Sequence, residues 1–298
     1  MAVLAFFHGI LLRIFGMMLS ALLVWNVPPN FGRTTIEPLD QDNVKLQFSV
    51  MSDVHVETNN LEVFEGFAKA LRDIAASKHR QNALVLLGDN TTNGKYSEYV
   101  MLYSLLSHYN CTDNTLAAIG NHDMAHATVD PREAIALHSF FYQSYTGTQN
   151  DKPYYSKTIN GCPLIVLGGE VVHRDATADF SAEQLAFLDD AMRGAETGKP
   201  IFVFLHQPLS RIGAQAGEIR GILERYKNVY FFSGHLHSPQ SVTKSGGVTY
   251  VNLPSLTGIR ASGTGYQVEV YDDTVVLRAR NYIAGEWLED DVYTAKLK

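Results

Sequence analysis

Apolar residues in this chain form two alternating patterns: short continuous runs and longer amphipathic stretches. The runs 83–88 (ALVLLG) and 201–206 (IFVFLH) are almost wholly apolar, which is typical of strands buried on both faces. Residues 61–77 instead place Phe64, Phe67 and Leu71 on one face at helical spacing. The whole pattern predicts strands at 45–52, 83–88, 115–120, 163–169, 201–206 and 229–234, and helices at 61–77, 97–109, 133–145, from Ser181 onward and at about 215–226.

The C-terminal part of the chain has a different pattern. Residues 248–253, 266–272 and 274–282 alternate as strands without helices between them, and Asp272-Asp273 marks a hairpin turn. An α/β body followed by a run of antiparallel strands suits two stacked sheets flanked by helices.

The N-terminal segment 2–25 is almost wholly apolar, with His8, Arg13 and Ser20 as its polar side chains. Three interpretations remain open: an uncleaved membrane anchor, which we favour, a cleaved signal peptide, or an amphipathic membrane-associated helix. With Arg13 held on the cytoplasmic side, the rest of the chain would be extracytoplasmic. The alternatives are a secreted protein and a cytoplasmic, membrane-associated one. Residues 26–43 are expected to form a linker, and residues 44–298 the folded domain.

The charge balance bears on which partners the protein can bind. The formal net charge is −7 and no block of Lys and Arg occurs, so a general nucleic-acid surface is not expected. An acidic protein that acts on an anionic substrate needs a local positive charge, which bound metal ions would supply. Cys111 and Cys162 have no zinc-finger spacing. They are either buried apolar residues or, outside the cytosol, a possible disulfide.

Polar side chains with metal-binding chemistry follow five of the predicted strands. Because ligands bind at the carboxyl ends of strands in open α/β sheets, these residues are expected to meet at one edge. Imidazole and carboxylate ligands suit Mn, Fe or Zn. The residues are Asp53 and His55, then Asp89, then Asn121 with His122 and Asp123, then His206, and finally His235 and His237.

The spacing within this set adds to the prediction. In Asp53-x-His55 and His235-x-His237, an alternating backbone would point both side chains the same way, so either pair could offer two ligands to one site. A lone carboxylate such as Asp89 can bridge two ions. One such pair arises by chance in many proteins, whereas the ordered set after apolar strands is specific.

The motifs DVH, GDN, GNHD, LHQP and GHLH, in this order, resemble the calcineurin-like metallophosphoesterase family over roughly residues 45–260. The segment 88–94 (GDNTTNG) resembles the cyclic-nucleotide-phosphodiesterase-like branch, although Asn90 and Thr92 depart from its usual pattern. The resemblance implies a four-layer α/β/β/α sandwich of two mixed sheets, preceded here by the N-terminal hydrophobic helix. It also implies two divalent metal ions as cofactors.

The resemblance further implies a role for each site residue. Asp53, His55, Asp89 and His237 would hold one metal. Asp89, Asn121, His206 and His235 would hold the second, with Asp89 bridging. His122 would contact the phosphate or protonate the leaving group, and Asp123 would orient His122. The reaction implied is direct attack of a metal-bound hydroxide on phosphorus.

The substrate is expected to be a small phosphodiester or phosphomonoester. The GDxxY pattern of purple acid phosphatases is missing, as are the GDxVDRG and GNHE patterns of protein Ser/Thr phosphatases. One alternative is a membrane-associated pyrophosphate hydrolase of a lipid-linked nucleotide. Another is a non-catalytic, membrane-anchored binding protein, against which the full ligand set argues. His126, His173 and Arg174 are further residues that could lie near the site.

Overall fold

The computed structural model describes residues 7, 8, 10, 11, 14, 34–125, 130–173, 176–195 and 198–298. Its body contains two six-stranded sheets. The first runs in the order β14 (Glu286–Lys296), β13 (Thr274–Asn281), β12 (Thr264–Val270), β1 (Leu46–Met51), β2 (Ala83–Leu87) and β3 (Thr115–Ala118). The second runs β10 (Ser241–Ser245), β11 (Val248–Asn252), β9 (Val229–Ser233), β8 (Ile201–Phe204), β5 (Cys162–Val166) and β4 (Tyr155–Ile159).

Both sheets are mixed, as predicted for this α/β fold. In the first sheet β1, β2 and β3 are parallel, whereas β12, β13 and β14 pair antiparallel. In the second, β5, β8, β9 and β11 are parallel, and β4 and β10 pair antiparallel at the two edges. A small hairpin of β6 (Val171–Val172) and β7 (Ala178–Asp179) lies outside both sheets.

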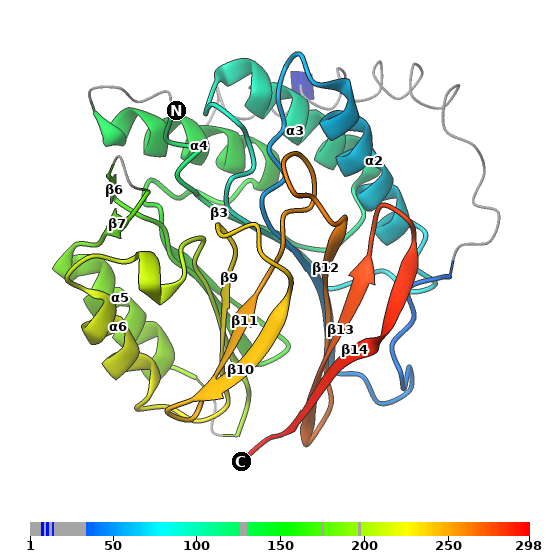
Figure 1. Cartoon of the computed structure of the whole chain (residues 1–298), viewed down its shortest axis with the longest axis vertical. Coiled ribbons are helices and arrows are strands. Elements are labelled where there is room, and N and C mark those ends of the chain that lie inside the picture. The colour runs from blue at the N-terminus through cyan, green and yellow to red at the C-terminus, as the bar shows by residue number, and fades with distance from the viewer. Residues whose placement is uncertain are drawn as a thin grey trace.

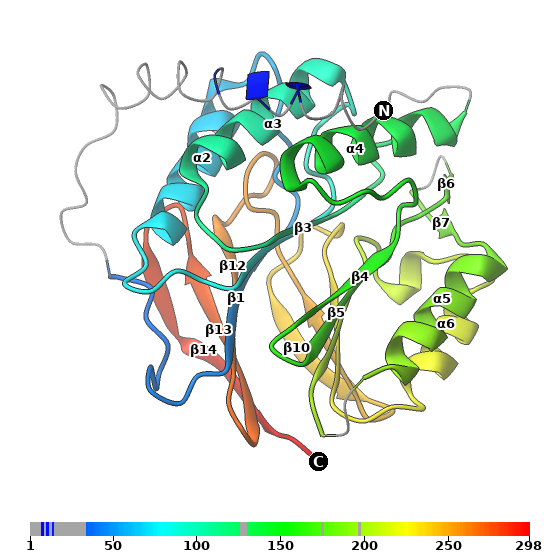
Figure 2. The ribbon, with the colours of Figure 1, turned by 180° about the vertical axis from the view of Figure 1, so that it is seen from behind.

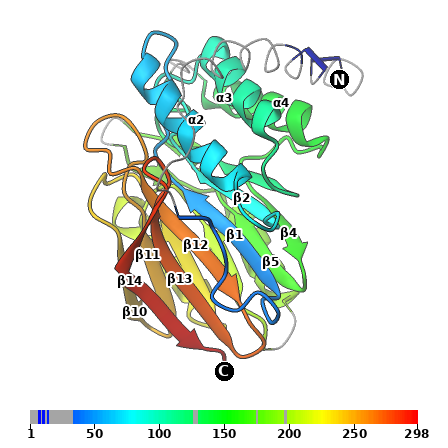
Figure 3. The same cartoon turned by 90° about the vertical axis from the view of Figure 1, so that its right-hand side faces the viewer.

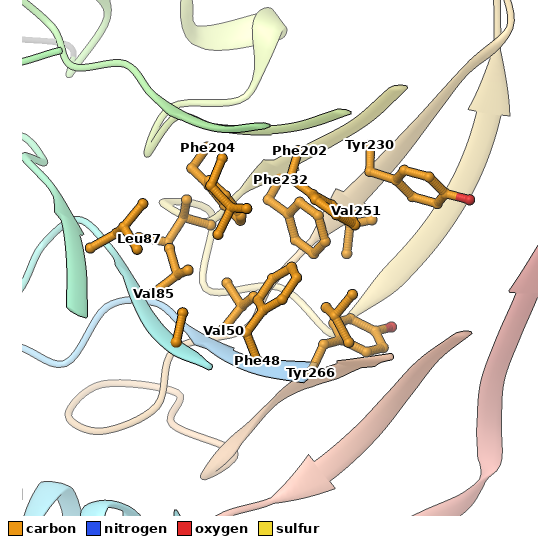
Figure 4. Close-up of a cluster of buried hydrophobic side chains, with 14 of the residues drawn as sticks. Phe48, Val50, Val85, Leu87, Phe202, Phe204, Tyr230, Phe232, Val251 and Tyr266 are labelled. Atoms are coloured by element: carbon orange, nitrogen blue, oxygen red, sulfur yellow. The ribbon is translucent and has the colours of Figure 1, made fainter. Parts of the chain in front are cut away.

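The two sheets pack face to face on an aromatic-rich core (Figure 4). Phe48 of β1 meets Phe202 of β8 edge to face, with ring centroids 5.0 Å apart. Val50, Val85 and Phe232 lie in the same layer and are fully buried. Apolar residues on the inner faces of parallel strands therefore hold the sandwich together, as the continuous apolar runs indicated.

Helices cover the outer faces and complete four layers, α/β/β/α. The first sheet is covered by α2 (Leu61–Ala75), α3 (Tyr96–Tyr109) and α4 (Pro131–Thr146), which lie near one another in Figure 3. The second is covered by α5 (Ala182–Arg193) and α6 (Ala216–Leu223), which lie at the lower left of Figure 1 and at the lower right of Figure 2. A single 3₁₀ turn, η1 (Leu209–Arg211), follows β8.

The strands that the sequence did not predict are edge strands. β10 and β14 are largely exposed, and three of the five residues of β4 are exposed, so their sequences lack the apolar runs of the central strands. The C-terminal strands also divide between the sheets. β11 joins the second sheet beside β9, whereas β12 to β14 extend the first.

Most of the predicted N-terminal helix lies outside the described residues. The described positions 7, 8, 10, 11 and 14 are helical, and the His8 Nε2 atom lies 2.9 Å from the Tyr96 hydroxyl. Among the residues that the structure describes, no helix is long and apolar enough to span a membrane. The anchor, its orientation and the extracytoplasmic location stay predictions.

The described part of the expected linker contacts the folded domain. The Thr34 hydroxyl donates to the Gly285 carbonyl at 3.1 Å, and the Leu39 amide donates to Glu269 at 2.9 Å. Residues 34–43 therefore lie against β12 and the β13–β14 turn.

The two cysteines lie in different layers. Cys111 is buried under the helices of the first sheet, and Cys162 is buried between the two sheets. They form no disulfide with each other, which favours the interpretation of two small buried side chains over a crosslink.

Candidate metal centre

Five loops that follow parallel strands meet at one edge of the sandwich. Asp53 and His55 follow β1, and Asp89 follows β2. Because parallel strands end on the same side, their loops converge. The remaining loops follow β3, β8 and β9, and carry Asn121 and His122, then His206, then His235 and His237.

The backbone of these loops is unusual. Ligand-type residues adopt positive φ at Asp53 (54°), His55 (51°), Asp89 (48°), His235 (70°) and His237 (48°). Left-handed backbone is uncommon outside glycine, and it clusters at functional sites. The expectation that strand alternation would aim the paired side chains is thus wrong. All five residues lie beyond the strand ends, and the left-handed turns aim them.

The first cluster contains Asp53, His55 and His237, whose ligand atoms all lie within 4.8 Å of one another. The His237 Nε2 atom is 3.0 Å from Asp53 Oδ1, and the two Nε2 atoms of His55 and His237 are 3.1 Å apart. Two imidazole nitrogens and one carboxylate oxygen therefore face a common point.

The second cluster contains Asp89, His206 and His235, again with ligand atoms within 4.8 Å of one another. His206 Nε2 is 3.1 Å from Asp89 Oδ2, and His55 Nε2 lies 4.0 Å from the same oxygen. Asp89 therefore lies between the clusters. His235 and His237 face different clusters, so they do not offer two ligands to one site.

A third cluster links His122 to this centre. Its ligand atom lies within 4.8 Å of those of His55 and Asp89. The Asp89 Oδ1 atom accepts the His122 backbone amide at 2.8 Å, which leaves Oδ2 directed at the clusters. The His122 side chain is thereby held at the edge of the paired clusters.

Backbone carbonyls orient the imidazoles of His206 and His237. The Nδ1 atom of His206 lies 2.9 Å from the Leu87 carbonyl, and that of His237 lies 2.9 Å from the Ile259 carbonyl. In the neutral imidazole, a proton donated from Nδ1 leaves Nε2 with a free lone pair. Sequence reasoning missed these partners, because any residue type supplies a carbonyl.

Asp123 and His122 are arranged differently from the expected pair. The His122 Nδ1 atom lies 2.8 Å from the Thr92 carbonyl, so that carbonyl holds the ring. The buried Asp123 carboxylate instead accepts the Gly120 amide at 2.9 Å and the Thr91 amide and hydroxyl at 2.9 and 2.8 Å. Asp123 thus joins the loops after β2 and β3 and acts on His122 only through them.

Two polar atoms in these loops have no hydrogen-bond partner within the described residues: Asn121 Oδ1 and His235 Nδ1. The buried Asp53 Oδ1 and His206 Nε2 atoms face other residues of the clusters, His237 and Asp89 respectively. Buried polar atoms are normally satisfied, so a group of them in one place indicates a missing partner. Oxygen and imidazole donors without thiolates fit Mn, Fe or Zn.

The electrostatics of the site favour a bound cation. Burial lowers the pKa of His55 and of His235 to about 4, so both imidazoles are neutral at pH 7. Burial also opposes a charge on His206, but Asp89 and Asp53 outweigh it and raise its pKa to about 9. Burial would raise the pKa of Asp53, yet the His206 charge and the His237 hydrogen bond lower it overall. The two carboxylates therefore attract positive charge to this point.

Glycines allow the loops to approach this closely. A Cβ atom on Gly120 would lie 2.2 Å from Asp89 Oδ1, and one on Gly234 would lie 1.9 Å from Ser52 Oγ and 2.6 Å from Asp53 Oδ2. Ser52 in turn donates to Asp53 Oδ2 at 2.6 Å. The sequence motifs contain these glycines because the ligands pass directly over them.

The other residues considered from the sequence lie apart from the clusters or outside the described residues. His173 is exposed and pairs with Asp179 at 2.7 Å in the small β6–β7 hairpin. His126 and Arg174 lie outside the described residues. Arg211 of η1, which sequence reasoning missed, is close enough for its charge to act on His235.

A family model described as calcineurin-like phosphoesterase matches residues 46–239, a range that contains all five loops with the candidate ligands. The chain belongs to this family. It is therefore a hydrolase of phosphate esters, and the resemblance seen in its motifs is confirmed. No curated protein matches the chain.

Two solved structures share the fold. A dimetal phosphatase from Danio rerio aligns with a TM-score of 0.65 at 16% identity, covering 86% of this chain and 100% of that one. The purple acid phosphatase PPD1 from yellow lupin (Lupinus luteus) seeds aligns with a TM-score of 0.62 at 13% identity, covering 84% of this chain and 53% of that one. At these identities the likeness concerns the fold alone.

Proposed function

We propose that the chain uses two divalent metal ions to hydrolyse a small phosphodiester or phosphomonoester. The observation that carries the proposal is the pair of clusters joined at Asp89, in each of which the ligand atoms all lie within 4.8 Å of one another. Asp53, His55 and His237 with Asp89 would hold one ion, and Asn121, His206 and His235 with Asp89 the other. Bound together, two such ions neutralise the phosphate and lower the pKa of water.

The chain's own residues prepare this site in a defined way. Carbonyls of Leu87 and Ile259 hold His206 and His237 with Nε2 facing inward. The Thr92 carbonyl holds the His122 ring, so that its Nε2 atom faces away from that carbonyl. In this position His122 would contact a phosphate oxygen and donate a proton to the leaving group. Asp123 supports the geometry by tying two loops together.

The test is hydrolysis of bis(p-nitrophenyl) phosphate and p-nitrophenyl phosphate by metal-stripped protein, before and after addition of Mn²⁺. We expect activity only with metal, and the preferred compound distinguishes a diesterase from a monoesterase. Asp89→Ala should lose metal and activity together. His122→Ala should keep metal but lose about 10²–10⁴-fold in kcat, the usual contribution of one acid–base group.

The exposed His79 provides a matched control, since it precedes the N-terminal end of β2, whereas the clusters lie beyond the C-terminal ends of the strands. His79→Ala should keep both metal content and kcat. Full activity of Asp89→Ala, or of the metal-stripped protein, would contradict the proposal.

A further inference from the structure

A cavity of about 370 Å³ lies beside the metal centre. One wall is the start of α2, around Val63 and Gly66, and the other is the loop 256–261 between β11 and β12. Its volume falls in the range of small-molecule sites in proteins. None of the candidate metal ligands lines it, so the cavity is a separate feature.

The loop 256–261 is a wall shared by the cavity and the metal centre. On its inner side, the Leu256 amide donates to the Ser52 carbonyl at 3.0 Å, and the Ile259 carbonyl holds His237. The Thr257 hydroxyl donates to the Val54 carbonyl. On its outer side, the same three residues line the cavity. The cavity is thus separated from the ligands by one thickness of backbone.

Gly258 is the residue of this loop that has no side chain. It has a φ of +79°, is exposed, and an added Cβ would meet only His55, at 3.8 Å. Because no side chain rises from Gly258, a molecule bound at the metal centre can extend across it into the cavity. A residue with a side chain would obstruct that path and would be strained at this φ.

The lining of the cavity selects for hydrocarbon. Ile259 and the half-buried Ile283 supply aliphatic surface over the buried side chains of Val63 and Leu256, and among the described lining residues none is aromatic. Ile259 at its edge is 78% exposed, and the neighbouring Leu61 is 65% exposed. A nucleobase would be expected to find an aromatic stacking partner, which this lining does not offer.

Charges at the mouth of the cavity argue against a second anionic group. Glu62 and Glu65 place two carboxylates there, against one ammonium from Lys69. A phosphate or sulfate would meet net negative charge, whereas an aliphatic chain would not. Asn60 is already engaged, since its side chain accepts the Val63 amide and caps α2.

We propose that this cavity binds the aliphatic chain of the substrate, so that the enzyme prefers phosphoesters of an alkyl or lipid alcohol. The inference rests on the proposed function, because the phosphate of that substrate would lie at the metal centre. Ala261, which lines the cavity and is exposed, is the position at which the cavity can be filled without disturbing the core.

The test is a series of methyl, butyl and octyl p-nitrophenyl phosphate diesters, used below their micelle thresholds with the full-length, Mn²⁺-loaded protein. Each buried methylene strengthens binding about fourfold. We therefore expect kcat/KM to rise at least about tenfold from methyl to octyl, mainly through KM. Ala261→Trp should abolish this rise while still hydrolysing the methyl ester, and Ala261→Ser should keep it.

Two results would overturn the inference: equal kcat/KM across the series, or a chain-length effect that survives in Ala261→Trp. Calorimetry with octyl phosphate and with methyl phosphate measures the contribution of the cavity to binding without turnover. We expect octyl phosphate to bind at least about tenfold more tightly. If no ester is hydrolysed, the proposed function fails, and the calorimetric ratio alone then decides the cavity. Equal binding of the two phosphates refutes it.

Discussion

Replacement of Gly120 by alanine should disable the metal centre without unfolding the protein. The new Cβ would lie 2.2 Å from Asp89 Oδ1 and 2.3 Å from the Asp89 backbone nitrogen. An ordinary contact between such atoms is roughly 3.5 Å, so Asp89 or the loop that carries it must move by about 1 Å. Metal–ligand distances tolerate changes of only about 0.2 Å.

The expected effect follows from this mismatch. Asp89 lies between the two ligand clusters, so its displacement would affect both ions. A misplacement of about 1 Å costs about 10²-fold in rate, and a disturbed ligand support costs about 10–100-fold in metal affinity. We therefore expect Gly120→Ala to lower kcat about 100-fold and Mn²⁺ affinity at least about tenfold.

The assay combines a Mn²⁺ titration by calorimetry with the kinetics of p-nitrophenyl ester hydrolysis and a thermal melt. Gly221→Ala is the matched control, because Gly221 lies within α6 and an added Cβ meets nothing within 4 Å. That variant should keep its activity and gain about 0.5–1 kcal/mol of stability. A folded Gly120→Ala protein with unchanged metal affinity and kcat would refute the reasoning.

Three further predictions concern the body of the fold. Asp73→Ala should lower the free energy of unfolding, measured in urea, by about 3–5 kcal/mol, because it leaves the fully buried Arg280 without its 2.7 Å ion pair. The double variant Asp73→Ala with Arg280→Met should recover much of that loss, and equal destabilisation of the single and double variants would contradict the prediction. Burial lowers the pKa of His138 from 6.5 to about 4. The neutral His138 side chain therefore contributes its full stabilisation of the fold above about pH 6.5, and this stabilisation is lost as the pH falls toward 4. Between pH 7 and 4, the free energy of unfolding in urea should therefore fall by about 3 kcal/mol more for the wild type than for His138→Gln. If the stabilities of the two proteins fall in parallel with pH, the effect is excluded. Burial raises the pKa of Cys111 to about 12, so mass spectrometry should show iodoacetamide labelling at pH 8 about 1000-fold slower than in urea, and rapid labelling of the native protein would show that the thiol is accessible.

The sequence predicted which loops would meet at the candidate metal centre, because chemistry and pattern coincide there. Polar residues such as Asp89 and His206 interrupt continuous apolar runs, and parallel strands bring such interruptions to one edge. Edge strands such as β14 carried no comparable signal. Their outward residues face water, so no apolar run marks them.

What the sequence could not provide is the set of backbone contacts that orient the side chains. The backbone carbonyls of Thr92 and Ile259 hold His122 and His237. Every residue type has a backbone carbonyl, so the sequence does not show which residues play this role. Asp123 looked like the partner of its neighbour His122. The Asp123 carboxylate instead accepts hydrogen bonds from the backbone amides of Gly120 and Thr91. Hydrogen bonds from amides to a buried, charged carboxylate are stronger than those between neutral groups.

In the proposed metal ligands, the left-handed backbone makes the stability of the fold compete with metal binding and catalysis. Each non-glycine residue held in that region is strained by roughly 1–2 kcal/mol, and Asp53, His55, Asp89, His235 and His237 are all held there. Glycine at any of these positions would relieve the strain and remove a ligand in one step. Directed evolution for heat resistance alone should therefore enrich inactive proteins, and a screen of this fold needs a turnover step in every round.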